Sequence, residues 1–259
     1  MKKSHLLKAA GIIGGLTLVS RILGMIRDMA SAGSFGTSWQ WDAFIYAFML
    51  PNFMRRLVGE GALSSAFIPV YTDISQKKGK EAAAHFGRVV FTLLFWGLIV
   101  FLVLAELVLW MFPKYFSLPP ALNLTVELLR VLFPYLFFIS LCALSSGILN
   151  CHQHFSSPAL GPIILDIIWI AGVLWIAPLG GSFPENRVLL LSICILISGI
   201  FQLGVQVPPL LKFGFVPRFS FDLNHPGLRQ VGKLMLPAVL GFAILQINML
   251  VDMTLGFWV

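Results

Sequence analysis

The feature that most constrains this chain is a succession of apolar stretches, each long enough to cross a lipid bilayer. A membrane-spanning helix needs about 20 consecutive apolar residues. Charged residues make up only 11% of the 259 residues, whereas a globular domain carries roughly 25%. The stretches lack the alternating pattern of a β-strand, so we expect an all-α polytopic membrane protein.

We expect about seven transmembrane helices, separated by short polar or Pro/Gly-rich breaks. The predicted stretches cover residues 6–32, 39–71, 86–112, 122–149, 159–179, 188–211 and 231–259. The third is expected to stop at Pro113. The seventh is still apolar at Val259, with no polar tail after it. We therefore expect this sequence to be part of a larger transporter.

Basic residues gather in alternate loops, which predicts the orientation in the membrane. If the N-terminus is cytoplasmic, only Lys114 and Arg187 fall outside, and the basic residues expected inside are Lys2, Lys3, Lys8, Lys77, Lys78, Lys80, Arg88, Lys212, Arg218, Arg229 and Lys233. Residues 76–80 are predicted to form a cytoplasmic loop near an anionic leaflet, not a nucleic-acid site. A cleaved signal peptide is not expected, because charges separate the first apolar run from the cleavage-like segment 30–32.

Four arginines, Arg21, Arg27, Arg55 and Arg56, lie within the first two predicted stretches. Each would cost about 2.5–3.5 kcal/mol at the bilayer centre, so each needs a watery cavity, a counter-ion or the interface. Arginine presents a planar, permanently charged fork that binds phosphate oxygens bidentately. We expect a polar cavity for an anionic, phosphate-bearing substrate. Structural ion pairs and snorkelling to the interface are the alternatives.

Acidic residues are interleaved with these arginines. Asp28 follows Arg21 by two helical turns on the same face, and Glu60 follows Arg56 at ion-pair spacing. Asp42 opens the second stretch. These acids are candidates for lining the same cavity.

Three further acids lie in the later stretches. Glu127 stands three residues before Arg130 and is expected to form a local pair with it. Glu106 and Asp166 have no basic residue nearby in the sequence. Each is either a protonatable relay group or a neutral acid packed between helices.

Other chemistry-bearing residues do not form a recognisable motif. Cys142, Cys151 and Cys194 are scattered among apolar residues and are interpreted as small core side chains. His152 and His154 are expected in a solvated turn. No nucleotide-binding motif, nucleophile elbow or zinc spacing is present, so we predict neither a metal, a cofactor nor an enzymatic activity.

Several motifs carry a family resemblance. They are the segment SRILGMIRD at 20–28, DAF at 42–44, PNFMRRL at 51–57, EGA at 60–62 and AFIP at 66–69. The later segments FPY at 133–135 and GILN at 147–150 fit the same pattern. Together they resemble the MurJ/MviN family of the multidrug/oligosaccharidyl-lipid/polysaccharide exporter superfamily.

The resemblance implies a two-lobed, alternating-access transporter in the bacterial cytoplasmic (inner) membrane. Its implied function is to flip lipid II, the undecaprenyl-diphosphate-linked peptidoglycan precursor, to the outer leaflet for cell-wall biogenesis and cell shape. Residues 1–215 would form the first lobe of six helices, and 216–259 a cytoplasmic linker and the first helix of a truncated second lobe. The implied partners are lipid II and membrane lipids, with a coupling ion or the membrane potential as the driving force, and no nucleic acid.

The resemblance also implies roles for single residues. Arg21, Arg27 and Arg55 match functional arginines of the family, and Asp42 and Glu60 match its functional acids. The candidate substrate-binding set also includes neighbours in the same motifs: Ser20, Asp28, Asn52 and Arg56. The alternatives are another glycolipid or drug exporter of the superfamily, or a membrane scaffold for cell-wall synthesis that transports nothing.

Overall fold

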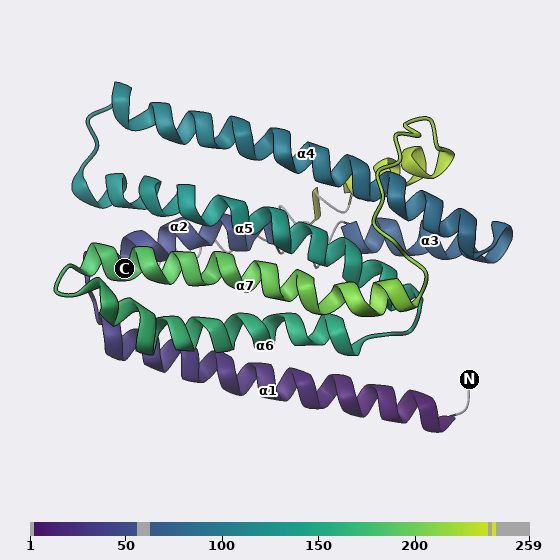
Figure 1. Cartoon of the computed structure of the whole chain (residues 1–259), viewed down its shortest axis with the longest axis horizontal. Helices are drawn as coiled ribbons and strands as arrows, with labels where there is room; N and C mark the ends of the chain where they lie inside the picture. The colour runs from purple at the N-terminus through teal and green to yellow at the C-terminus, as the bar shows by residue number, and fades with distance from the viewer. Residues whose placement is uncertain (1–2, 56–62, 238–239, 242–259) are drawn as a thin grey trace.

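The computed structural model describes residues 3–55, 63–237 and 240–241, in which long helices lie side by side (Figure 1). The all-α prediction is confirmed, and the described part of the chain contains no strand. The elements are α1 Lys3–Phe35, α2 Trp39–Arg55, α3 Leu63–Lys78, α4 Lys80–Tyr115, α5 Pro120–Cys151, α6 Ser156–Ala171, the short helices η2 Gly172–Ile176 and η3 Ala177–Gly180, and α7 Pro184–Lys212. Residues 226–237 are also helical.

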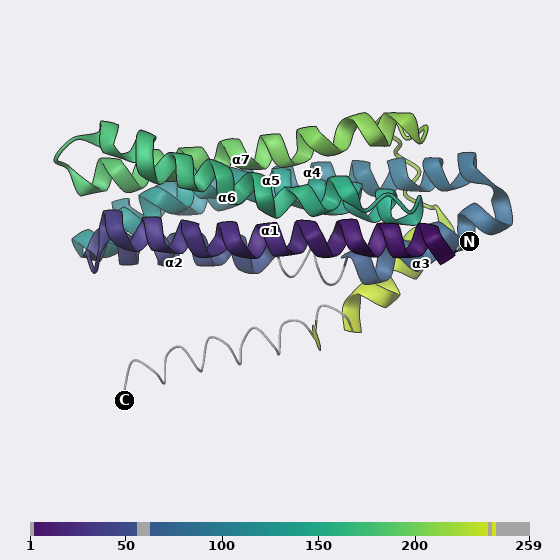
Figure 2. The same ribbon diagram turned by 90° about the horizontal axis from the view of Figure 1, so that it is seen from below.

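The helices run back and forth between two ends of the bundle (Figure 1). The α3–α4 and α5–α6 turns and the end of α7 lie at the end where α1 begins. The α1–α2, α4–α5 and α6–α7 turns lie at the opposite end. Seen from below, α1 and α2 occupy one face of the bundle, and α7 and α4 lie towards the other (Figure 2).

Two predicted boundaries differ from the structure. The third helix does not stop at Pro113, because α4 continues to Tyr115 with Pro113 in its last turn. Residues 76–80 are not a loop: α3 ends at Lys78, Gly79 turns the chain with a φ of 88°, and α4 begins at Lys80. Glycine adopts this positive φ without a steric cost, so a single residue suffices for the turn.

The second and seventh predicted stretches are described only in part. The second is represented by α2 and by α3, with residues 56–62 outside the described chain. Most of the seventh, from 242 onwards, also lies outside it. The chain between α7 and helix 226–237 returns along α4, where Phe219 packs on Phe95 with ring centroids 5.1 Å apart.

Within the described residues, four helical segments are long and apolar enough to cross a membrane: Lys80–Tyr115, Pro120–Cys151, Ser156–Gly180 and Pro184–Lys212. In its most apolar part, α5 has 72% of its residues buried, against 6% for α4. Helix α5 is therefore the centre of the bundle, and α4 lies at its edge. The exposed apolar side chains of α4 suit contact with lipid.

Two close approaches hold α7 against its neighbours. A Cβ added at Gly199 of α7 would lie 2.9 Å from Cδ2 of Tyr135 on α5. A Cβ added at Gly172 would lie 3.1 Å from the Cβ of Cys194 on α7. Because small residues allow helix backbones to approach closely in a membrane, these glycines set the spacing around α5 and α7.

Candidate functional site

Arg27 of α1, one of the predicted site residues, forms ion pairs with two acids. Its Nη1 donates to Oδ1 of Asp166 on α6 at 2.9 Å. Its Nε and Nη2 both donate to Oδ1 of Asp28, at 3.0 and 2.8 Å. The two acids differ in exposure: the side chain of Asp28 is 71% exposed, that of Asp166 only 6%. Arg27 thus has one edge towards the protein interior and one towards the surface.

The face of α1 towards α6 follows from helical spacing. Ser20, Gly24, Arg27 and Ser31 recur at three- and four-residue intervals, which places them on one side of the helix. Ser20 hydrogen-bonds to Asp166. A Cβ at Gly24 would lie 3.9 Å from Oδ2 of that carboxylate. A small residue at position 24 therefore leaves room for the acid between the two helices.

Trp169, one turn after Asp166 on α6, joins three helices. Its ring lies 5.0 Å from the guanidinium carbon of Arg27, and its Nε1 donates to Oγ of Ser31 at 3.1 Å. It also makes edge contacts with Phe44 and Phe48 of α2. A cation over an indole face is stabilised by the ring quadrupole. Arg27 is thereby fixed by both a buried carboxylate and an aromatic face.

The other predicted site residues have varied surroundings. Arg21 is exposed, and Ser20 and Asn52 are partly buried. Asp28, which lies two helical turns after Arg21 in α1, forms an ion pair with its neighbour Arg27. Asp42 is exposed near the start of α2. Arg55 is the last residue of α2, and Arg56 and Glu60 lie outside the described residues.

Helix geometry relates the depths of three arginines. Arg21 and Arg27 lie fourteen and eight residues before the end of α1, and Arg55 lies sixteen residues after the start of α2. At about 1.5 Å per residue, their backbones are about 21, 12 and 24 Å from the α1–α2 turn. Arg21 and Arg55 therefore stand at similar depths on two helices of the same face of the bundle (Figure 2).

The structure corrects the reading of three acids. Glu106 and Asp166 do have basic partners, Arg130 and Arg27, on neighbouring helices. Arg130 pairs with Glu106 of α4 at 3.2 Å, so the predicted local pair with Glu127 is wrong. These partners lie 24 and 139 residues away in the chain, beyond the reach of local spacing. An acid inside a membrane segment was the one available signal, since such a group usually has a partner.

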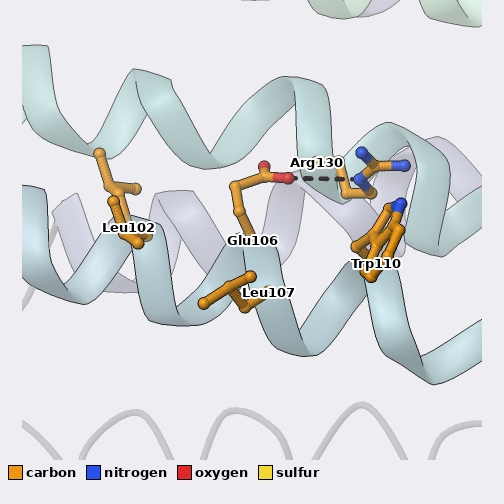
Figure 3. A pocket seen from close by; sticks show the side chains of 6 residues that line it. Leu102, Glu106, Leu107, Trp110 and Arg130 are labelled. Carbon is orange, nitrogen blue, oxygen red and sulfur yellow. Dashed lines mark hydrogen bonds and ion pairs between the residues drawn. The ribbon is translucent and has the colours of Figure 1, made fainter.

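The Glu106–Arg130 pair lies in a pocket away from the Arg27 cluster, which consists of Arg27, Asp28, Asp166 and Trp169. The pocket has a volume of about 380 Å³ and is lined mainly by apolar side chains of α4 (Figure 3). Both side chains are partly exposed, Glu106 34% and Arg130 44%. This pair faces outwards from the edge of the bundle, whereas Arg27 lies at the α1–α6 contact.

The end of the bundle where α1 begins carries a partly buried histidine. His152, predicted in a solvated turn, stacks on Phe213 with ring centroids 4.9 Å apart and planes 7° apart. Burial, and secondarily the charge of Lys80, lowers the pKa of His152 below its usual value. His152 thus lies in the predicted turn but is partly covered by Phe213 from the chain after α7.

Known proteins resemble this chain over most of its length. A sequence profile described as "Lipid II flippase MurJ" matches residues 31–257. The chain is 34% identical to the lipid II flippase MurJ of Burkholderia cenocepacia over 96% of this chain and 49% of that relative. It is also 34% identical to the probable lipid II flippase MurJ of Vibrio cholerae, with the same coverage. The chain thus spans about half the length of the curated relatives it matches.

Solved structures show the same fold. The structure titled "Lipid II flippase MurJ, inward closed conformation" superposes with a TM-score of 0.75 at 30% identity, over 93% of this chain and 49% of that one. A multidrug resistance MATE family transporter of the MOP superfamily superposes with a TM-score of 0.62 at 16% identity, which bears on the fold alone.

The apolar, membrane-length helices and the match to solved structures therefore define a polytopic membrane protein with the helical fold of MOP-superfamily transporters. Within that class, the matched profile covers most of the sequence. The chain belongs to the lipid II flippase MurJ family.

Proposed function

We propose that the full-length protein containing this chain flips lipid II from the inner to the outer leaflet by alternating access. Membership of the MurJ family supports this function, and the Arg27 cluster is the observation that carries the chemistry. A guanidinium fixed at the α1–α6 contact, with one edge towards the surface, suits the diphosphate that links the lipid to its sugar. Residues 1–215 are proposed to form one lobe of the transporter.

Arg21, Arg27 and Arg55 are proposed to bind the diphosphate together. The similar depths of Arg21 and Arg55, and the place of their helices on one face of the bundle, support a shared site. The proposed site also includes the motif neighbours Ser20, Asp28, Asp42, Asn52, Arg56 and Glu60. A cavity lined by these groups would relieve the insertion cost of the arginines.

The proposed orientation places the end of the bundle where α1 begins in the cytoplasm. Lys77, Lys78, Lys80 and Lys212 lie at helix ends on that side, whereas Lys114 and Arg187 lie near the opposite turns. This distribution supports a cytoplasmic N-terminus in the bacterial inner membrane. The driving force is proposed to be an ion gradient or the membrane potential, which supplies about 2.3 kcal/mol per charge per 100 mV.

The test uses the full-length protein in a bacterial strain depleted of its own flippase. Arg21→Lys, Arg27→Lys and Arg55→Lys, combined in one variant, keep the charge but remove the bidentate fork. We expect that variant to fail to restore growth and to leave lipid II inaccessible to an externally added lipid II-degrading enzyme. Arg218→Lys, at an exposed position beyond α7, is the matched control and should restore both. Full growth with the triple variant would show that only net charge matters and would reject the bidentate site.

A further inference from the structure

Asp166 contacts the surface of Arg27 that faces the interior. Its Oδ1 accepts from Nη1 alone, and its side chain is almost fully enclosed by protein. The bond therefore occupies one corner of the guanidinium. The opposite edge, formed by Nε and Nη2, remains directed towards Asp28.

Asp28 shows what that outward edge can bind. A single carboxylate oxygen accepts from both Nε and Nη2, at distances typical of charge-assisted hydrogen bonds. Because Asp28 is largely exposed, its ion pair is of the kind that contributes little to stability. An incoming anionic oxygen can replace it at small cost. The buried bond to Asp166 is much harder to replace.

We infer that Asp166 is a positioning residue for substrate: it holds Arg27 from behind so that the Nε/Nη2 edge meets the phosphate oxygens. The ring of Trp169 contacts the guanidinium of Arg27 and supports the same orientation. Ser20 hydrogen-bonds to the Asp166 carboxylate, and Gly24 leaves room for it between α1 and α6. This inference rests on the proposed function. It adds to it a residue on α6 outside the arginine-bearing motifs.

For Asp166→Asn, the positioning role predicts the opposite change in anion affinity from the one that net charge alone predicts. Removing a negative charge beside a cationic site should strengthen anion binding if charge alone decides. If Asp166 positions the fork, Asp166→Asn should instead weaken binding, because Arg27 loses the partner that orients it. Asp28→Asn should tighten binding, because within the proposed site Asp28 occupies the Nε/Nη2 edge of Arg27 that the phosphate would take.

The experiment measures binding of undecaprenyl diphosphate to the full-length protein in lipid nanodiscs, with undecaprenol as the uncharged comparison. We expect about tenfold weaker binding for Asp166→Asn, as for loss of a hydrogen bond between charged groups. We expect about fivefold tighter binding for Asp28→Asn. Glu106→Gln, which neutralises an acid paired with Arg130 on a different pair of helices, is the control and should bind as the parent does.

A spectroscopic measurement on the unmodified protein covers the case in which Asp166→Asn does not fold. With ¹⁵N-labelled arginine, assigned through Arg27→Lys, undecaprenyl diphosphate should shift the Nε and Nη2 signals of Arg27 and leave Nη1 in place. A shift of Nη1 alone, or equal or tighter binding by Asp166→Asn, would overturn the positioning role. Parent-like binding by Arg27→Gln would instead reject the proposed diphosphate site, and this inference with it.

Discussion

Gly199 of α7 lies so close to Tyr135 of α5 that a Cβ at position 199 would stand 2.9 Å from the tyrosine ring. Gly199→Ala should therefore lower stability by about 1–3 kcal/mol through overpacking. Gly204, on the same helix with nothing within 4 Å of its added Cβ, provides the control. Thermal unfolding in detergent should show a lower midpoint for Gly199→Ala and no decrease for Gly204→Ala. Equal midpoints would mean that α5 and α7 separate easily.

For the Glu106–Arg130 pair, we expect replacing one partner to lower stability more than replacing both. Glu106→Leu alone leaves Arg130 without its partner in an apolar pocket, and should cost roughly 1–2 kcal/mol. Glu106→Leu combined with Arg130→Leu should recover most of that loss, because a well-packed apolar pair can replace an ion pair. The unfolding midpoints of the three proteins decide the point. A double variant less stable than the single one would show that the pair is itself stabilising.

His152 predicts a pH dependence at the end of the bundle where α1 begins. Burial is the main cause that lowers its pKa, and Lys80 is the second. The folded state therefore favours the neutral ring. Its contribution to stability is complete above the unfolded pKa of about 6.5 and is lost as the pH falls below that value.

An NMR titration of the His152 ring tests the order of these causes. Phe213→Ala, which uncovers the ring, should raise the pKa of His152 more than Lys80→Gln does. The opposite order would assign the shift to charge in place of burial. Because Phe213 follows α7 directly, the titration also reports whether the chain after α7 stays on the α5–α6 turn.

Cysteine labelling in intact cells tests the orientation. Lys78→Cys, at the end of α3, should resist a membrane-impermeant thiol reagent until the cells are opened. Ser117→Cys, in the α4–α5 turn at the opposite end, should react at once. Both are introduced into full-length protein in which Cys142, Cys151 and Cys194 have been replaced. Immediate labelling of Lys78→Cys would contradict a cytoplasmic N-terminus.

Local sequence information was sufficient for the all-α fold and for single helices. The apolar length of residues 122–149 predicts α5, and the segment 20–28 indicates Arg27 as a site residue. The partner of Arg27 was not predictable, because Asp166 lies 139 residues away in the chain. Which helices become neighbours depends on side-chain packing across the whole bundle. For the same reason the spacing of Glu127 and Arg130 was misleading, because Arg130 pairs with Glu106 of the neighbouring helix α4.

Turn chemistry accounts for the other errors. A run of lysines around Gly79 has the composition of a loop, yet one glycine with positive φ is enough to reverse the chain. Pro113 was predicted to end α4 early. It removes one backbone donor and occupies the last turn, where the helix continues two residues further.

The contacts of Trp169 tie α1, α2 and α6 into a rigid unit. Helix α1 packs chiefly on α6, and α2 packs chiefly on α5. The indole of Trp169 connects the two pairs, because it bonds to Ser31 of α1 and contacts Phe44 and Phe48 of α2. If α1 slid along α2, α6 would lose either the hydrogen bond to Ser31 or the edge contacts with Phe44 and Phe48. Tilting all three helices together breaks none of them. In the proposed alternating access, these contacts favour a movement of α1, α2 and α6 together over a sliding of one along another.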